Sequence, residues 1–513
     1  GLEFSDNILA ENNNYFLDIS DSKDLEGIPP SIQESFFQKA KARGKEGWSV
    51  GLDGPSYVAF MTYADNRKLR EKLFRAFNSR AFKKEKFDNR KLLKKIIKLR
   101  HARAQLLGYP THAHFVLERR MAGNPDKVKD FLDEIGQHAL PVALKDVAEL
   151  QKFVLKQKGP KNIQRWDFLY WSEKWKKEKF SIDEESLRAF FSLDKTLQGV
   201  FLVTNKLYGL TFHPSQEIER YHSEVQVYEV RNSNGEHQGI LYADFFPRPG
   251  KRGGAWMSSF RGQKKEKGKN IRPHVSIVGN FSRPTGTAPS LLTFDEVKAL
   301  FHEFGHALHS LLSDCTYKTL SGANVYWDFV ELPSQILENW AFEKECLDLF
   351  AQHYQTGEKI PEKIVQSIIE SSNFLESYNT VRQLSFAYLD QAWHTTDPQT
   401  IKTVDQFENS IMEKNKLLPD VVGTNFSCAY THVFSGSYSA GYYSYKWSEV
   451  LDADAFDYFK EKGIFNQEVA AAFNHHILSR GGSEHPMELY KRFRGRGPSV
   501  TPLLKRAGLI TNP

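Results

Sequence analysis

Cysteine is scarce in this sequence. Three residues, Cys315, Cys346 and Cys428, occur in 513, far apart and with no Cys-x-x-Cys pair. A sparse and odd-numbered set excludes the disulfide framework of a small secreted domain and fits a reducing compartment. We therefore expect a cytoplasmic protein. The chain opens on Gly1 without a basic-then-apolar leader, so that targeting is not readable from this end.

Long hydrophobic runs and a strong charge of one sign are also lacking. The longest uncharged stretch, residues 421–445, is long enough to span a bilayer but is filled with Gly, Ser, Thr, Asn, Tyr and His. The 69 Lys and Arg against 63 Asp and Glu leave a formal net charge of +6, a mild excess for this length. Its basic runs are typical of solvated helix faces and loops. We expect neither a membrane nor a nucleic acid as partner.

The patterning that is present predicts a mainly α-helical protein with a small β-sheet, an α+β fold. Apolar residues recur at helical spacing in residues 67–107 and 125–158, and again from residue 293 onward. Residues 225–230 alternate with period two, residues 232–235 supply a turn, and residues 239–246 and 274–278 are two further strands. The last of these strands lies either at an exposed edge, where it pairs with an extended peptide, or inside the sheet.

These helical and alternating patterns divide the chain into three predicted regions. Residues 1–215 are expected to form a mostly helical lobe, and residues 216–290 a small sheet region beside the active site. Residues 291–513 are expected to form a helical catalytic region, interrupted by a loop rich in Tyr and Gly.

The sharpest motif is His302-Glu303-Phe304-Gly305-His306. Thr293 or Asp295 can cap a helix that runs through it. Positions i and i+4 of a helix share one face, so both imidazoles can reach a single ion, and Glu303 lies beside a water on that ion. The motif predicts a metal site.

A catalytic zinc ion usually takes three protein ligands, so that one more ligand is needed. In one common arrangement the third ligand is a histidine that follows on the same chain segment. That arrangement needs Gly at position 309 and His at position 312, but this sequence has His309 and Leu312 there, so it is excluded. A carboxylate on a following helix is the other common solution, and the candidates are Asp314, Asp328, Glu331 and Glu338. Spacing favours Glu331 as the ligand, with Glu338 behind it, but leaves the other two open.

Several motifs together resemble the thimet oligopeptidase family of zinc metallopeptidases, most closely its bacterial oligopeptidase A and peptidyl-dipeptidase branches. The two that surround the metal motif are HEFGHALH at 302–309 and DFVELPSQILENW at 328–340. The others are KRGGAWM at 251–257, NFSRP at 280–284, HVFSGSYSAGYYSYKW at 432–447 and GGSEHPMELYKRFRGR at 481–496. The resemblance covers essentially the whole chain.

The resemblance implies two lobes around a deep substrate channel, with one zinc ion at its floor. It assigns His302, His306 and Glu331 as the metal ligands and Glu303 as the general base. The tyrosine-rich segment supplies residues that contact the substrate or steady the reacting carbonyl. These are His432, Tyr438 and Tyr445, with Tyr442 at a neighbouring substrate-binding position.

The function that the resemblance implies is the hydrolysis of short, unstructured peptides by internal cuts. A peptidyl-dipeptidase that releases C-terminal dipeptides is the first alternative, and an inactive peptide-binding remnant that lacks part of its channel is the second. Family members carry a further helical segment ahead of the position where Gly1 aligns. That segment is either deleted, cleaved yet still bound, or supplied as another chain, and in the last two cases a separate or cleaved N-terminal segment is a partner that completes the channel. We otherwise expect a monomer.

Overall fold

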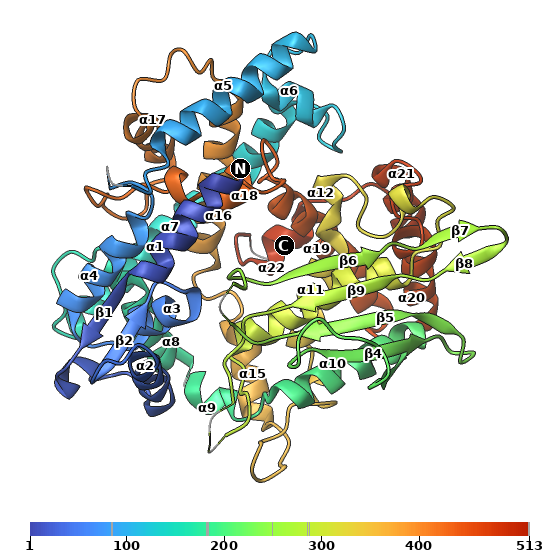
Figure 1. Ribbon diagram of the computed structural model, residues 1–513, viewed down its shortest axis with the longest axis horizontal. Helices are drawn as coiled ribbons and strands as arrows, with labels where there is room; N and C mark the ends of the chain where they lie inside the picture. Colours follow the sequence, from blue (N-terminus) through green and yellow to red (C-terminus); the bar gives the residue numbers. More distant parts are fainter. Residues whose placement is uncertain (84–85, 181–183, 249, 285, 287, 511–513) are drawn as a thin grey trace.

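The computed structural model describes residues 1–83, 86–180, 184–248, 250–284, 286 and 288–510. It is mainly helical with a small mixed sheet, which confirms the fold class predicted from the sequence (Figure 1). Among the helices of these residues, none combines the length and the apolar character needed to cross a membrane.

In the described part of the chain, the first 210 residues form ten α-helices and a short two-stranded sheet. The helices are α1 (Leu2–Asn14), α2 (Pro30–Ala42), α3 (Gly54–Tyr63), α4 (Arg67–Asn78), α5 (Arg90–Leu106), α6 (His112–Leu117), α7 (Pro125–Lys156), α8 (Phe168–Phe180), α9 (Glu184–Arg188) and α10 (Leu193–Tyr208). The strands β1 (Phe16–Ile19) and β2 (Trp48–Gly51) pair antiparallel. Because each of these strands has four residues, their alternation is too short to stand out in the sequence.

A mixed sheet follows, with the strand order β3-β4-β5-β9-β6. Its strands are β3 (Thr211–Pro214), β4 (Gln226–Arg231), β5 (His237–Asp244), β6 (Trp256–Arg261) and β9 (His274–Val278), and β7 (Lys264–Glu266) and β8 (Lys269–Ile271) form a separate hairpin. The predicted hairpin of β4 and β5 is antiparallel, whereas β5 and β9 pair in parallel. Strand β9 is therefore an interior strand, and the edge beside it is β6, which the sequence pattern did not predict.

Helices return from residue 294. They are α11 (Phe294–Leu311), α12 (Trp327–Val330), α13 (Leu332–Glu338), α14 (Lys344–Leu347), α15 (Glu362–Ser371), α16 (Glu376–Thr395), α17 (Val404–Met412), α18 (Thr431–Phe434), α19 (Ser444–Lys462), α20 (Gln467–Phe473), α21 (Pro486–Arg494) and α22 (Thr501–Arg506). Of the two predicted caps for α11, the structure uses Thr293. Its Oγ1 accepts from the Glu296 amide at 3.1 Å, and the Glu296 carboxylate accepts from the Thr293 amide at 2.8 Å.

The largest core joins one face of the sheet to α10, α11 and the C-terminal helices. It includes Leu241 and Ile277 from the sheet, Phe304 from α11 and Trp340 after α13, all at most 1% exposed. In Figure 1 this half lies on the right, and α1 to α8 with α16 to α18 form the other half. Strands and helices from both sides of residue 290 share this core. The predicted domain boundaries at residues 215 and 290 therefore stay a prediction.

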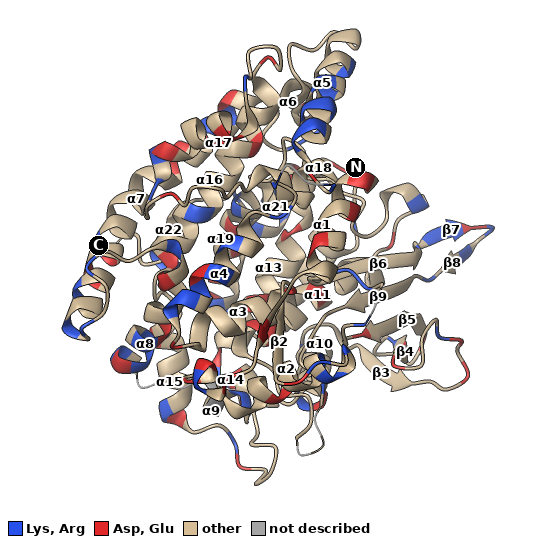
Figure 2. Cartoon of the chain, turned by 60° about the vertical axis from the view of Figure 1, so that its left-hand side comes forward, with Lys and Arg blue, Asp and Glu red and all other residues tan. Residues whose placement is uncertain are grey.

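A cavity of about 1360 Å³ opens between the two halves, and residues of α1, β6, α11 and α18 line it. Charges of both signs are dispersed over the helices around it, whereas α5 carries mainly Lys and Arg (Figure 2). The metal motif of α11 lies at this cavity, where its side chains face residues from the opposite half.

Candidate metal centre and active site

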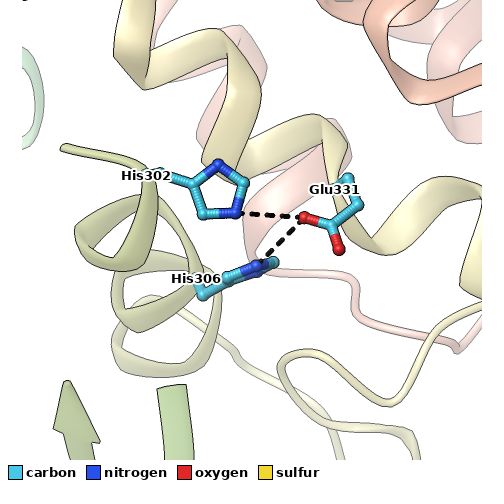
Figure 3. A group of neighbouring side chains, drawn as sticks. All are labelled: His302, His306 and Glu331. Carbon is cyan, nitrogen blue, oxygen red and sulfur yellow. Dashed lines mark ion pairs between the residues drawn. The ribbon is translucent and has the colours of Figure 1, made fainter. Parts of the chain in front are cut away.

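Helix α11 and the α12–α13 turn bring three side chains together (Figure 3). The Nε2 atoms of His302 and His306 each lie 3.2 Å from Oε2 of Glu331, and all three candidate ligand atoms lie within 4.8 Å of one another. Two imidazole nitrogens and one carboxylate oxygen at this spacing fit around one divalent ion with bonds of about 2 Å. The residues present therefore fit a catalytic zinc site with a position left open.

The other two open candidates for the third ligand have different partners. The Asp328 carboxylate accepts from the Tyr443 hydroxyl at 2.7 Å and from the Ala122 amide at 3.0 Å. Asp314 lies beyond the end of α11, where it accepts from Lys265 at 3.0 Å. Glu331, at 3% exposure, is the carboxylate that converges with both histidines.

Gly305 explains how α11 and α13 come close enough for this convergence. A Cβ atom at this position would lie 2.2 Å from the Pro333 carbonyl oxygen and 2.5 Å from the Ser334 Cα. The chain segment that follows Glu331 thus packs directly on the backbone of α11. Ser334 also donates from Oγ to Oε2 of Glu331 at 3.0 Å, which orients the carboxylate. The glycine inside the motif is therefore required for the close packing that brings Glu331 to the two histidines.

We expect Gly305→Ala to lower the free energy of unfolding by about 3 kcal/mol and to weaken zinc binding, because the new methyl group displaces α13. Urea unfolding and zinc titration measure the two effects. The matched control is Gly136→Ala in α7, where the added Cβ would meet its nearest described neighbours at 3.6 and 3.7 Å, ordinary contact distances. That variant should gain about 0.5–1 kcal/mol. Equal stability of Gly305→Ala and the wild type would contradict this packing.

Glu338 supports the site from behind. Its Oε1 lies 2.7 Å from Nδ1 of His302, so that Nδ1 donates to it and Nε2 is the ring nitrogen that faces Glu331. A carboxylate behind a metal-binding histidine fixes the tautomer and the orientation of the ring. This is the supporting position that the sequence analysis expected for Glu338.

The electrostatics of the group favour a deprotonated Glu331. Burial opposes its charge, but His306 and His302 outweigh burial and hold the pKa of this carboxyl well below its ordinary value. Burial likewise opposes protonation of His302, but Glu331 and Glu338 outweigh it and raise the pKa of that imidazole well above its ordinary value. The arrangement is therefore one that stabilises a positive charge beside the Glu331 carboxylate.

Glu303 has the environment of a general base. It is 7% exposed and lines the cavity, and its Oε2 has no hydrogen-bond partner among the described residues. Burial raises the pKa of its carboxyl above the ordinary value, and the histidines beside it oppose that rise. A carboxylate with a raised pKa accepts a proton more readily than one in water.

The tyrosine-rich segment between α18 and α19 faces the same group. The Tyr438 hydroxyl donates to Oε1 of Glu331, and the Tyr438 ring stacks on that of Tyr445 with centroids 4.9 Å apart. Burial and the nearby Glu331 raise the pKa of both phenols well above 10, so they remain hydrogen-bond donors at neutral pH. His432, Tyr438 and Tyr445 all line the cavity.

His432 and Tyr442 complete the aromatic cluster in different ways. The His432 ring is exposed to the cavity, yet the surrounding protein lowers its pKa by desolvation, which favours the neutral ring. Tyr442 packs 5.9 Å from His432 and 5.2 Å from Tyr445, measured between ring centroids. Its hydroxyl donates to Gln383 at 3.0 Å, and it is not among the described residues that line the cavity.

Strand β6 forms a further part of the cavity wall. Residues 256–260 line the cavity along most of the strand, whose inner side pairs with β9. The outer edge of such a strand can pair with an extended peptide by main-chain hydrogen bonds. The sequence pattern allowed β9 to be the exposed edge strand, but in the structure the edge strand beside it is β6.

A helix that presents two histidines and a glutamate, a further glutamate from the turn between α12 and α13, and a large cavity at their side together define a metallopeptidase. The comparison with known families agrees: the model of peptidase family M3 matches residues 60–509. The chain belongs to this family.

Individual relatives span nearly the whole chain. Oligopeptidase A of Salmonella typhimurium is 40% identical over 99% of this chain and 76% of its own length. Dipeptidyl carboxypeptidase of Escherichia coli is 35% identical over 99% of this chain and 75% of its own. The solved structure of PZ peptidase A with an inhibitor shares the fold, with a TM-score of 0.56 and 14% identity over 95% of this chain and 77% of that one.

Proposed function

We propose that this protein is a zinc-dependent oligopeptidase that cuts short, unstructured peptides internally. In this proposal His302, His306 and Glu331 hold one zinc ion, and Glu303 is the general base. The observation that carries it is the convergence of these three side chains beside Glu303, whose Oε2 has no hydrogen-bond partner in the described part of the chain, at a cavity large enough for an extended peptide. A folded domain does not fit into a cavity of about 1360 Å³.

Each residue of the site has a separate role in the proposed hydrolysis. A bound zinc ion supplies Lewis acidity, which polarises a carbonyl group and lowers the pKa of a water molecule toward neutrality. Glu303 accepts the proton of the attacking water and passes it to the leaving amine. Tyr438, Tyr445 and His432 donate hydrogen bonds to the oxygen of the scissile carbonyl as negative charge develops on it. Strand β6 orients the peptide through its backbone.

Mass-spectrometric mapping of the products of one octapeptide tests the proposal. The peptide is offered with a free and with an amidated C-terminus. We expect internal cuts in both forms, because internal cutting needs no contact with the terminal carboxylate. No cutting of either form would support the second alternative, an inactive peptide-binding remnant.

A peptidyl-dipeptidase is the second candidate function, and Arg80 is the observation that favours it. Arg80 lines the cavity, donates to the Asn12 side chain at 2.9 Å and to the Phe77 carbonyl at 2.7 Å, and lies 3.5 Å above the Phe77 ring. No described carboxylate lies within ion-pair distance of it, and burial lowers its pKa to about 10. A fixed, partly desolvated guanidinium at a peptide cavity suits the terminal carboxylate of a substrate.

Arg80→Gln separates the two candidate functions. For a peptidyl-dipeptidase we expect the wild type to prefer the free acid over the amide by about 10-fold or more in kcat/KM, and Arg80→Gln to abolish that preference. For an oligopeptidase we expect no preference in either protein. Arg252→Gln is the control, because Arg252 is a cavity-lining arginine that is exposed to solvent. A preference that survives Arg80→Gln would exclude Arg80 as the anchor.

We also propose that the protein works in the cytoplasm. All three cysteines are buried and free, which fits a reducing compartment. The monomeric state and the separate N-terminal segment stay predictions. Size-exclusion chromatography with light scattering tests the first directly.

A further inference from the structure

A buried polar cluster lies behind the tyrosine-rich segment, on the side away from Glu331. Its centre is Asp390 on α16, which is fully buried. Its Oδ1 accepts from the Ala440 amide and its Oδ2 from the Tyr442 amide, each at 2.9 Å. The neighbouring Gln391 donates from Nε2 to the Ala440 carbonyl at 3.0 Å. One turn of α16 thus binds both polar groups of Ala440 and the amide two residues later.

Ala440 has a backbone that needs such support. Its φ is 53°, in the left-handed region that residues with a Cβ rarely adopt. A strained conformation of this kind persists only where the surroundings hold it from several directions, and it is found preferentially at functional sites. The Asp390 and Gln391 side chains hold Ala440 from both sides.

A histidine and an arginine pack beside Asp390. Nδ1 of His394 lies 2.8 Å from the backbone carbonyl oxygen of Asp390 and 2.9 Å from its Oδ1, and Nη1 of Arg100 lies 3.0 Å from Nε2 of the same ring. A guanidinium can only donate, so Nε2 accepts and Nδ1 carries the proton that points to Asp390. Arg100 therefore donates to His394, and His394 donates to the backbone carbonyl of Asp390, so that the ring packs beside the carboxylate that binds the loop.

A second histidine holds the loop from α6. His112 is 2% exposed, and its Nε2 lies 3.1 Å from Oγ of Ser439. Nη2 of Arg103 lies 3.4 Å from the other ring nitrogen, so that Nε2 is the donor to Ser439. Residues 439–442 are therefore fixed by side chains from two helices of the half of the molecule that does not contain α11.

We propose that Asp390 is a positioning residue of the peptidase: by fixing residues 440–442 it sets where the hydroxyls of Tyr438 and Tyr445 stand beside the metal site. This inference rests on the proposed function, because it gives those hydroxyls a role in the reaction. Tyr438 precedes the fixed segment by two residues and meets Glu331 on its other side. A shift of the loop by about 1 Å would misplace the donors, and misplacement of this size costs about 100-fold in rate.

Asp390→Asn tests the proposal, because it keeps the shape of the side chain. Each carboxylate oxygen of Asp390 accepts from one backbone amide, whereas an asparagine has one acceptor oxygen and an NH₂ group that would face the second amide N–H. We expect kcat to fall about 100-fold with KM nearly unchanged, and the amides of residues 438–443 to exchange hydrogen at least about 10-fold faster. Hydrogen exchange followed by mass spectrometry reads the second effect without peptide or zinc.

Asp454→Asn is the matched control. Asp454 is equally buried, on α19, and accepts from the Tyr490 hydroxyl at 2.7 Å and from Arg496 at 2.6 Å. It is not among the described residues that line the cavity. We expect this variant to lose stability to a similar extent, while kcat and the exchange of residues 438–443 stay at wild-type values.

A double-mutant cycle with Tyr438→Phe separates positioning from general stability. If Asp390 acts through the Tyr438 hydroxyl, Asp390→Asn should cost less than about threefold in kcat once that hydroxyl is gone. Effects of the two changes that multiply would overturn the proposal, as would wild-type exchange of residues 438–443 in folded Asp390→Asn. A wild-type protein that cuts no peptide would instead overturn the proposed function and the catalytic role of the loop, and hydrogen exchange would still decide whether Asp390 fixes it.

Discussion

Glu303→Gln is expected to lower kcat by at least about 1000-fold while the protein still binds one zinc ion. The glutamine has the size of the glutamate and keeps one acceptor oxygen, but it does not accept a proton from water at neutral pH. Glu303 is not one of the three converging side chains, so that its loss leaves the ligand set intact. Initial rates on a quenched-fluorescence peptide and zinc analysis of the same preparation measure the two quantities.

Glu296→Gln is the control on the same helix. Glu296 forms the N-terminal cap of α11 with Thr293, and a glutamine serves in such a cap as well as a glutamate does. We expect its kcat to stay within about twofold of the wild type. Residual activity of Glu303→Gln above about one tenth of the wild-type value would contradict the assignment of Glu303 as the general base.

The second large effect is expected for Glu331→Ala, which should weaken zinc binding by at least about 1000-fold. Without this carboxylate the site keeps two imidazole nitrogens, one ligand short of the usual catalytic set. The Tyr438 hydroxyl also loses the acceptor that it has in the structure. Competition with a fluorescent zinc chelator measures the affinity, and activity in excess zinc shows what the metal restores.

Glu338→Ala provides the graded comparison. Glu338 contacts the ring of His302 at its far nitrogen, so its removal should cost about 10- to 100-fold in zinc affinity, less than the removal of Glu331. Full zinc occupancy of Glu331→Ala at an equimolar concentration of metal would contradict its role as a ligand. Equal losses of zinc affinity in both variants would contradict the different roles assigned to the two glutamates.

Much of the site could be predicted because its signals are local. The two histidines lie one turn apart on a helix, where spacing alone fixes their common face, and Glu303 is adjacent in sequence to the first of them. The β4–β5 hairpin was predicted for the same reason, since its alternation and its turn residues are adjacent in the chain. The third ligand needed more, because four carboxylates had acceptable spacing and only the packing of α13 on Gly305 separates them.

The parts that escaped prediction depend on contacts between distant segments. Strand β6 contains Gly-flanked and polar residues without clear alternation, and it becomes an edge strand only by pairing with β9. Asp390 belongs to an ordinary helical pattern, and its partners lie 50 and 52 residues further along the chain. The local sequence around a buried aspartate in a helix does not indicate which distant loop its side chain binds.

The measurement that tests the central claim most directly is a zinc titration of metal-depleted protein, with cleavage of an octapeptide followed by mass spectrometry. The account predicts no cleavage without metal, and internal cleavage that rises in proportion to zinc and reaches its plateau at one ion per chain. Cleavage that survives complete metal removal, or a protein that binds one zinc ion and still cuts no peptide, would contradict it.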